Sequence, residues 1–144
     1  MAETLGSLCD KLTIVKLKQF HSEDAEKLNS LKKQEEQLID EIDNFVTDAV
    51  SGKIPIEKLS FASNKVYKEA GNETNPIDGN LGEVFSLLAK ANCELWHEQE
   101  KVYEFETVPA TEKDVVVKKL ALLNLQRNKC IDIINNIMVK VCKR

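Results

Sequence analysis

Three charged side chains fall at positions where the helical pattern of this sequence calls for apolar ones. Glu35, Glu98 and Arg127 each interrupt a seam of apolar residues spaced three and four apart. A charge in such a seam costs several kcal/mol unless it is paired and hydrogen-bonded, so we expect Arg127 to form a bidentate pair with Glu35 or Glu98. Two interpretations stay open: a polar layer that fixes helix register, or a polar pocket that holds a ligand inside the bundle.

Further polar groups lie beside these seams. Asn92 and the sole tryptophan, Trp96, are one helical turn apart, and such a pair is typical either of a pocket wall or of a large core side chain. Asp10 and His21 share one face of the first predicted helix, and Lys18 lies on the adjoining face. Along one side of the last predicted helix the polar residues Asn124, Asn128, Asp132 and Asn135 recur.

The elements that must position these groups are helices. Apolar spacing predicts four of them, at about 4–20, 22–50, 80–104 and 111–141, and a shorter helix after Pro55 that ends before Gly71. Ser22 and Thr111 are the predicted N-caps of the second and last helices, Asp114 completes a capping box, and Gly52 suits a C-cap. Short connections between four long helices predict an all-α, up-down helical bundle that forms a single domain over residues 1–144.

Composition narrows the classes of partner. The net charge is −4 and no block of Lys or Arg occurs, so we expect no nucleic-acid ligand. Neither a secretory signal nor an apolar run of about 20 residues is present, which predicts a cytoplasmic protein with no membrane span. The long apolar seams leave open whether the protein is a monomer or a homodimer.

Cysteine and histidine usage gives no sign of a metal centre. The four cysteines stand singly with no CxxC pair, so we expect reduced packing residues rather than a zinc site or disulfides. His21 and His97 could ligate a metal together with Glu98, but a histidine near a helix end is more often a partner of the helix dipole. We therefore predict no metal ligands.

Several segments resemble a bacterial domain-of-unknown-function family whose members are found near glycosyltransferase genes for lipopolysaccharide. NCELWHEQE (92–100) and LNLQRNKCIDII (123–134) are similar to its NxxLWHxED and LNQxRNDxIExID motifs, and ETLGSLCDKLTIVKLKQFH (3–21) looks like its ETPGSIIDRLSILxLKIYH. Here the two halves stand in permuted order, Gln99–Glu100 replaces Glu-Asp, and Lys129 replaces an Asp. A permutation suits a bundle whose termini lie close together.

The resemblance implies a site but no reaction, because the family has no assigned biochemical role. Carried over residue by residue, it indicates Asp10, Lys18, His21, Asn92, Trp96, His97, Glu98, Gln126, Arg127, Asn128 and Asp132. With Glu35 from the seam analysis, these are the candidate ligand-binding residues.

Three functions fit the sequence. The first is a binding or accessory factor in cell-surface polysaccharide biosynthesis, which holds a sugar nucleotide or docks on a glycosyltransferase; Arg127, Lys18 and His21 would meet the anion and Trp96 would stack on the base or sugar. The second is a Mg²⁺-dependent all-α nucleotide pyrophosphatase, although the expected EExxE and ExxD spacing is missing from its candidate acids, Glu35, Glu36, Asp40, Glu94 and Glu98. The third is a purely structural helical adaptor. Whether the protein is an enzyme stays open.

Overall fold

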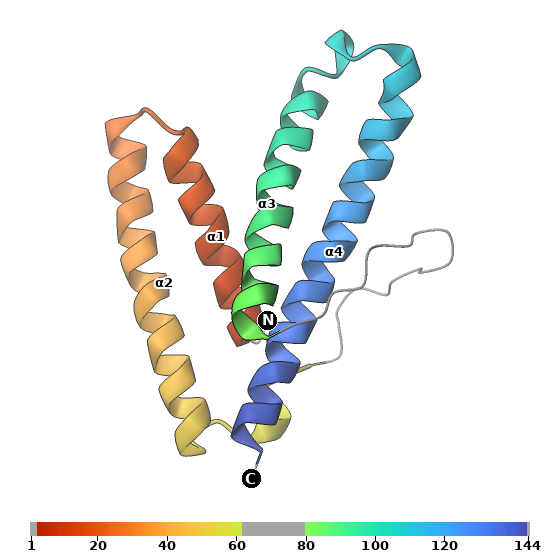
Figure 1. Ribbon diagram of the computed structural model, residues 1–144. Coiled ribbons are helices and arrows are strands. Elements are labelled where there is room, and N and C mark those ends of the chain that lie inside the picture. The colour runs from red at the N-terminus through yellow and green to blue at the C-terminus, as the bar shows by residue number, and fades with distance from the viewer. Residues whose placement is uncertain (1–2, 62–79, 144) are drawn as a thin grey trace.

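The computed structural model describes residues 3–61 and 80–143, and within them the chain is helical, with no strand (Figure 1). The α-helices are α1 (Leu5–His21), α2 (Ala25–Ser51), α3 (Leu81–Tyr103) and α4 (Ala110–Cys142), and the short 3₁₀ helices are η1 (Ile56–Lys58) and η2 (Phe105–Thr107). The predicted all-α bundle is confirmed. Of the predicted short helix after Pro55, the structure shows η1 alone: residues 59–61 are not helical, and the rest lies outside the described residues.

Two of the predicted caps are wrong. Ser22 is the C-cap of α1, and α2 is capped instead by Asp24, whose carboxylate accepts hydrogen bonds from the backbone N–H groups of Glu26 and Lys27. A carboxylate at this position also complements the positive end of the helix dipole.

The second wrong cap is that of the last helix, α4. This helix begins at Ala110, one residue before the predicted cap Thr111, and its N-cap position is Pro109, which makes no side-chain cap bond. The C-cap of α2 is as predicted, because Gly52 has a φ of 85°, in the left-handed region that favours glycine.

The helices form two antiparallel hairpins, α1–α2 and α3–α4, that diverge toward their connecting turns (Figure 1). α1 packs against both α3 and α4, whereas α2 packs mainly on α1 and only slightly on α4. The core lies at the end where the hairpins converge, around Leu5, Cys9, Ala49, Leu59, Val84, Leu88, Cys130, Ile134 and Met138. The apolar seam of α2 is therefore covered on one side only, and just Leu31 and Ala49 in that helix are buried.

Gly6 sets the close approach of α1 to α4. Its backbone N–H donates to Asn135 Oδ1 at 2.8 Å, and a Cβ at Gly6 would lie 2.5 Å from the carbonyl oxygen of Ile131. No larger residue fits without shifting the α4 backbone. This crossing brings Asp10, one turn further along α1, against α4.

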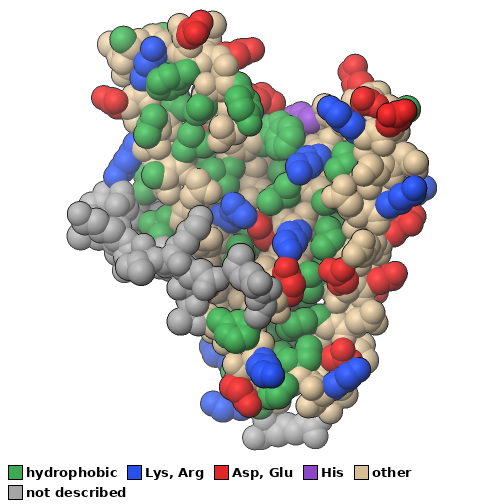
Figure 2. Space-filling view, turned by 180° about the vertical axis from the view of Figure 1, so that it is seen from behind, with side chains coloured by type: hydrophobic (Ala, Val, Ile, Leu, Met, Phe, Trp, Pro, Cys, Tyr) green, Lys and Arg blue, Asp and Glu red, His purple; other side chains and the backbone are tan. Residues whose placement is uncertain are grey.

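The outer end of the α3–α4 hairpin extends beyond the contact with α1. Figure 2 shows hydrophobic side chains gathered on this part of the molecule, and the exposed apolar side chains of the hairpin include Tyr103, Val115 and Val117. None of the helices described here is both long and apolar enough to cross a bilayer.

The four cysteines are free thiols, as predicted. Cys9 and Cys130 are buried in the core, and burial raises the pKa of each thiol to about 11. Both therefore stay neutral near pH 7 and act as small apolar packing groups.

Candidate functional site

Arg127 makes its bidentate pair with Asp10. Nε of Arg127 donates to Asp10 Oδ1 at 2.9 Å and Nη2 donates to Oδ2 at 2.7 Å. The expected pairing of Arg127 with Glu35 or Glu98 is wrong, because α1, rather than α2, lies against this part of α4, and Glu98 pairs instead with Lys101 and Lys119. Helical periodicity identified Arg127 as a charge that needs a partner, but it does not fix which helix supplies that partner.

Two further polar side chains complete this cluster. Nδ2 of Asn92, on α3, donates to Asp10 Oδ1 at 2.9 Å and to Thr13 Oγ1 at 2.7 Å, while the Thr13 hydroxyl donates to the Asp10 carbonyl at 2.7 Å. Asp10, Thr13 and Asn92 are buried. We call Asp10, Thr13, Asn92 and Arg127 the polar junction; it joins α1, α3 and α4 through hydrogen bonds among its members.

Glu35 lies in the α1–α2 interface. Its carboxylate accepts hydrogen bonds from Lys16 Nζ at 3.2 Å and from Gln19 Nε2 at 2.6 Å, both on α1. These two bonds lower the pKa of Glu35. Glu35 therefore fixes the two helices of one hairpin and takes no part in the polar junction.

Glu98 is buried between α3 and α4. Its Oε1 contacts Lys101 Nζ at 3.1 Å and Lys119 Nζ at 3.0 Å. Burial alone would raise the pKa of this carboxyl, but the hydrogen bonds from Lys119 and Lys101 outweigh it, so the net shift is downward. The other oxygen, Oε2, is buried and accepts no hydrogen bond from any residue that the structure describes.

The carboxylates considered for a Mg²⁺ site do not converge. Glu35, Glu36 and Asp40 lie on α2, which packs against α1 rather than along α3, the helix that carries Glu94 and Glu98. Over residues 3–61 and 80–143, no three His, Cys, Asp or Glu side chains come close enough to share a metal ion. The two facing acidic helices that a pyrophosphatase of this type needs are thus not formed by these residues.

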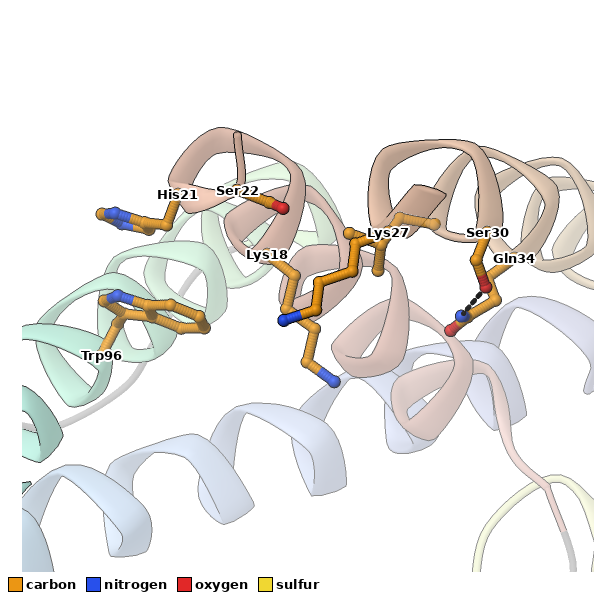
Figure 3. Close-up of a pocket in the computed structure, with 8 residues that line it drawn as sticks. Lys18, His21, Ser22, Lys27, Ser30, Gln34 and Trp96 are labelled. Atoms are coloured by element: carbon orange, nitrogen blue, oxygen red, sulfur yellow. Dashed lines mark hydrogen bonds between the residues drawn. The ribbon is translucent and has the colours of Figure 1, made fainter. Parts of the chain in front are cut away.

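At the outer end of α1 an aromatic stack joins two helices. The His21 ring lies parallel to the Trp96 indole, with centroids 4.8 Å apart and an interplanar angle of 8° (Figure 3). His97 meets His21 edge-on at 6.0 Å, and Trp96 Nε1 donates to Glu100 Oε1 at 2.8 Å. Trp96 is only half-buried, so it is not a core side chain.

A solvent-open pocket of about 390 Å³ lies beside this stack. It is lined by residues of α1, α2, α3 and the turn between α1 and α2: Lys18, His21, Ser22, Lys27, Ser30, Leu31, Gln34 and Trp96. The side chains of Lys18 and Lys27 extend into the space between Trp96 and α2 (Figure 3). None of these lining residues is acidic, and neither lysine forms an ion pair with another residue in the described part of the chain. The pocket therefore carries a local positive charge on an acidic protein.

The predicted site residues thus separate into groups. Lys18, His21 and Trp96 share the pocket, with His97 beside it, whereas Asp10, Asn92 and Arg127 belong to the polar junction. Glu35 and Glu98 form ion pairs with lysines outside the pocket lining. The remaining three lie on α4, half-buried and outside the pocket lining: Gln126, Asn128 and Asp132.

The contribution of α2 to the pocket was not predicted from the sequence. Lys27, Ser30 and Gln34 recur at steps of three and four just after the turn that follows His21. Antiparallel pairing of the two helices places that face of α2 opposite the end of α1. This spacing was a usable signal for the pocket.

Comparison with known proteins adds nothing to this assignment: no family model, no curated protein and no solved structure matches the chain.

Proposed function

We propose that this protein binds a sugar nucleotide in the pocket beside Trp96, as an accessory factor in cell-surface polysaccharide biosynthesis. The observation that carries the proposal is the presence in one pocket of the His21–Trp96 stack and of two ammonium groups, Lys18 and Lys27, that form no ion pair with a described residue. A ligand that suits it has an anionic part and a flat part.

The chemistry of the lining fits these two parts separately. Lysine ammonium groups bind phosphate as compact point charges, and the lining contains no carboxylate that would repel it. The Trp96 indole offers an aromatic surface on which a nucleobase or a sugar ring stacks. Because the pocket is open to water, which screens charge, we expect micromolar rather than nanomolar affinity.

Binding is favoured over pyrophosphate cleavage by the placement of the acids. The carboxylates of Glu35 and Glu98 form ion pairs with lysines outside the pocket, and the residues that line the pocket include no Asp or Glu. The link to polysaccharide assembly is supported by the resemblance of the segments around Trp96 and Arg127 to the family found near glycosyltransferase genes. In this proposal Arg127 supports the fold and does not contact the ligand.

Isothermal titration calorimetry with UDP-glucose and GDP-mannose tests the proposal. The double variant Lys18→Ala/Lys27→Ala should weaken binding by about tenfold or more, because it removes both charge-assisted contacts. Lys33→Ala, also an exposed lysine on α2 but outside the pocket, is the matched control and should bind like the wild type. Equal affinity of the double variant and the control would contradict the proposal.

A helical adaptor is the second candidate, favoured by the exposed apolar side chains of the α3–α4 hairpin. Val115 and Val117 are 63% and 55% exposed. If the exposed apolar side chains of this hairpin join two copies of the chain, Val115→Lys/Val117→Lys should lower the mass measured by analytical ultracentrifugation to that of a monomer. An unchanged mass would count against self-association through these residues.

A further inference from the structure

A second hollow continues from the pocket along the seam between α1 and α2. It has a volume of about 370 Å³, and eight residues line it: Lys11, Ile14, Val15, Lys18, Gln34, Gln37, Leu38 and Glu41. Lys18 and Gln34 line both hollows. The two spaces are therefore neighbouring parts of one groove, and we call the second part the α1–α2 groove.

The chemistry of the lining changes along this path. At the Trp96 end it is aromatic and cationic, whereas the α1–α2 groove presents the amides and carboxylate of Gln34, Gln37 and Glu41 beside the apolar Ile14 and Leu38. Lys11 is held by an ion pair with Glu3, whereas Lys18, where the two parts meet, forms no ion pair within residues 3–61 and 80–143. Amide and carboxylate groups next to apolar carbon suit a polyhydroxylated ring, which has polar edges and C–H faces.

Gln37 and Glu41 are placed to hydrogen-bond with hydroxyl groups of a ligand. Gln37 Nε2 donates to Glu41 Oε1 at 3.1 Å, which orients both side chains one helical turn apart. Neither the Gln37 amide oxygen nor the other Glu41 oxygen accepts a hydrogen bond from a residue within the described ranges. Both residues line the α1–α2 groove, so these two oxygens are the acceptors that we assign to donors on a ligand.

We infer that the α1–α2 groove is the sugar subsite, and that the ligand lies with its base at Trp96 and its diphosphate at Lys18 and Lys27. This inference rests on the proposed function and adds an orientation and a specificity to it. The stretch of α1 from Lys18 to Lys11 spans roughly 10 Å at the α-helical rise of 1.5 Å per residue, long enough to hold one hexose beyond the phosphates. In the reverse orientation the base would occupy the groove and leave the indole to the sugar.

Glu41 gives the subsite a preference among sugars. A carboxylate accepts hydrogen bonds from the hydroxyls of a neutral hexose, but it repels the carboxylate of a hexuronic acid. The groove should therefore select a neutral sugar nucleotide over its uronate counterpart.

The test is calorimetric titration of the full chain with UDP, UDP-glucose and UDP-glucuronate. We expect UDP-glucose to bind about tenfold more tightly than UDP, the size expected from one good charge-assisted hydrogen bond, and UDP-glucuronate to lose that gain. Glu41→Gln should reduce the ratio of the affinity for UDP-glucose to the affinity for UDP. It should also reduce the ratio of the affinity for UDP-glucose to that for UDP-glucuronate, and it should leave the affinity for UDP unchanged. Gln37→Ala should also reduce the advantage of glucose.

Glu36→Gln is the matched control, since Glu36 is an exposed acid of α2 outside both hollows. Equal affinities for UDP and UDP-glucose, or identical behaviour of Glu41→Gln and Glu36→Gln, would overturn the sugar subsite. In that case, UDP binding that depends on Lys18 and Lys27 would still support the proposed function. If UDP did not bind at all, both would fall. Thermal unfolding of each variant followed by circular dichroism checks that the fold is retained.

Discussion

Asp10 is 4% exposed, and the protein tolerates its charge because two side chains give its carboxylate three hydrogen bonds. Arg127 supplies the opposite charge in a bidentate geometry, and Asn92 adds a third hydrogen bond. Removing only one partner of such a pair leaves a buried charge without compensation. The polar junction is therefore a place where single substitutions should be costly.

Arg127→Met should lower the free energy of unfolding by about 3 kcal/mol, because Asp10 would keep its burial and lose two charged hydrogen bonds. Urea unfolding at pH 7 measures this loss. Lys140→Met, an exposed cation on the same helix, should change the stability by less than about 0.5 kcal/mol. An Arg127→Met protein more stable than the wild type would show that the junction is replaceable by apolar packing.

Glu98 should contribute stability that depends on pH. Its pKa in the folded protein lies below the ordinary value of 4.5, so the folded state binds protons less readily than the unfolded chain. The contribution is then fully present above about pH 4.5 and is lost as the pH falls through the lower folded-state pKa. Glu98→Gln should therefore be less stable than the wild type at pH 7, and the difference should shrink by pH 3 in chemical unfolding experiments. A constant difference would contradict this account.

At the scale of single residues, the sequence predicted which charges need an explanation but not how they pair. The seam pattern correctly singled out Glu98 and Arg127 as charges at helix interfaces. It could not identify Asp10 as the partner of Arg127, because pairing depends on the rotation and depth of helices that lie far apart in the chain. Asp10 and Lys18 were noted as polar groups on the first predicted helix, and the resemblance also indicates them.

At the scale of elements, the close crossing of α1 and α4 depends on the absence of a side chain at Gly6. Gly6→Ala would place Cβ 2.5 Å from the Ile131 carbonyl oxygen and 2.9 Å from its Cγ2, which forces the helices apart. We expect a loss of about 1–3 kcal/mol, the range for an overpacked interface, measured by urea unfolding.

Gly82→Ala provides the control for this substitution. Gly82 lies in the first turn of α3, and a Cβ there would meet nothing within 4 Å. Alanine has the higher helix propensity, so this variant should be as stable as the wild type or more stable by up to about 1 kcal/mol. Equal changes in the free energy of unfolding for Gly6→Ala and Gly82→Ala would show that the close approach at Gly6 does not contribute to stability.

The elements themselves were largely predictable, since each α-helix was expected within a few residues of its observed bounds. The apolar spacing of α1, α2, α3 and α4 continues over many turns, and this signal is strong in a long helix. The caps were less predictable, because Ser22 and Asp24 are both good N-cap residues and local sequence does not choose between them.

At the scale of the whole molecule, the divergence of the two hairpins was not foreseen. The long apolar seam of α2, interrupted by Glu35, suggested a helix packed into a four-helix bundle, but α2 is covered mainly by α1. Periodicity reports that a helix has an apolar face and not how much of that face is covered. The pocket and the α1–α2 groove lie on this less covered side.

Because the pocket joins α1, α2 and α3, ligand binding should stabilise the outer end of the molecule. UDP-glucose at about 100 times its Kd should add about 2.7 kcal/mol to the free energy of unfolding if it binds only the folded chain. Hydrogen exchange followed by mass spectrometry should show slower exchange around the turn between α1 and α2, with little change near the C-terminal half of α4. Uniform protection of all helices would indicate a different binding place.

Binding of a sugar nucleotide in the pocket beside Trp96 is tested most directly by the fluorescence of this single tryptophan. Titration with UDP-glucose should give a saturable change in Trp96 emission, because the ligand alters the surroundings of the indole. The change should be strongly weakened in Lys18→Ala/Lys27→Ala and retained in Lys33→Ala. A response that does not saturate, or that is the same in the wild type and both variants, would contradict the account.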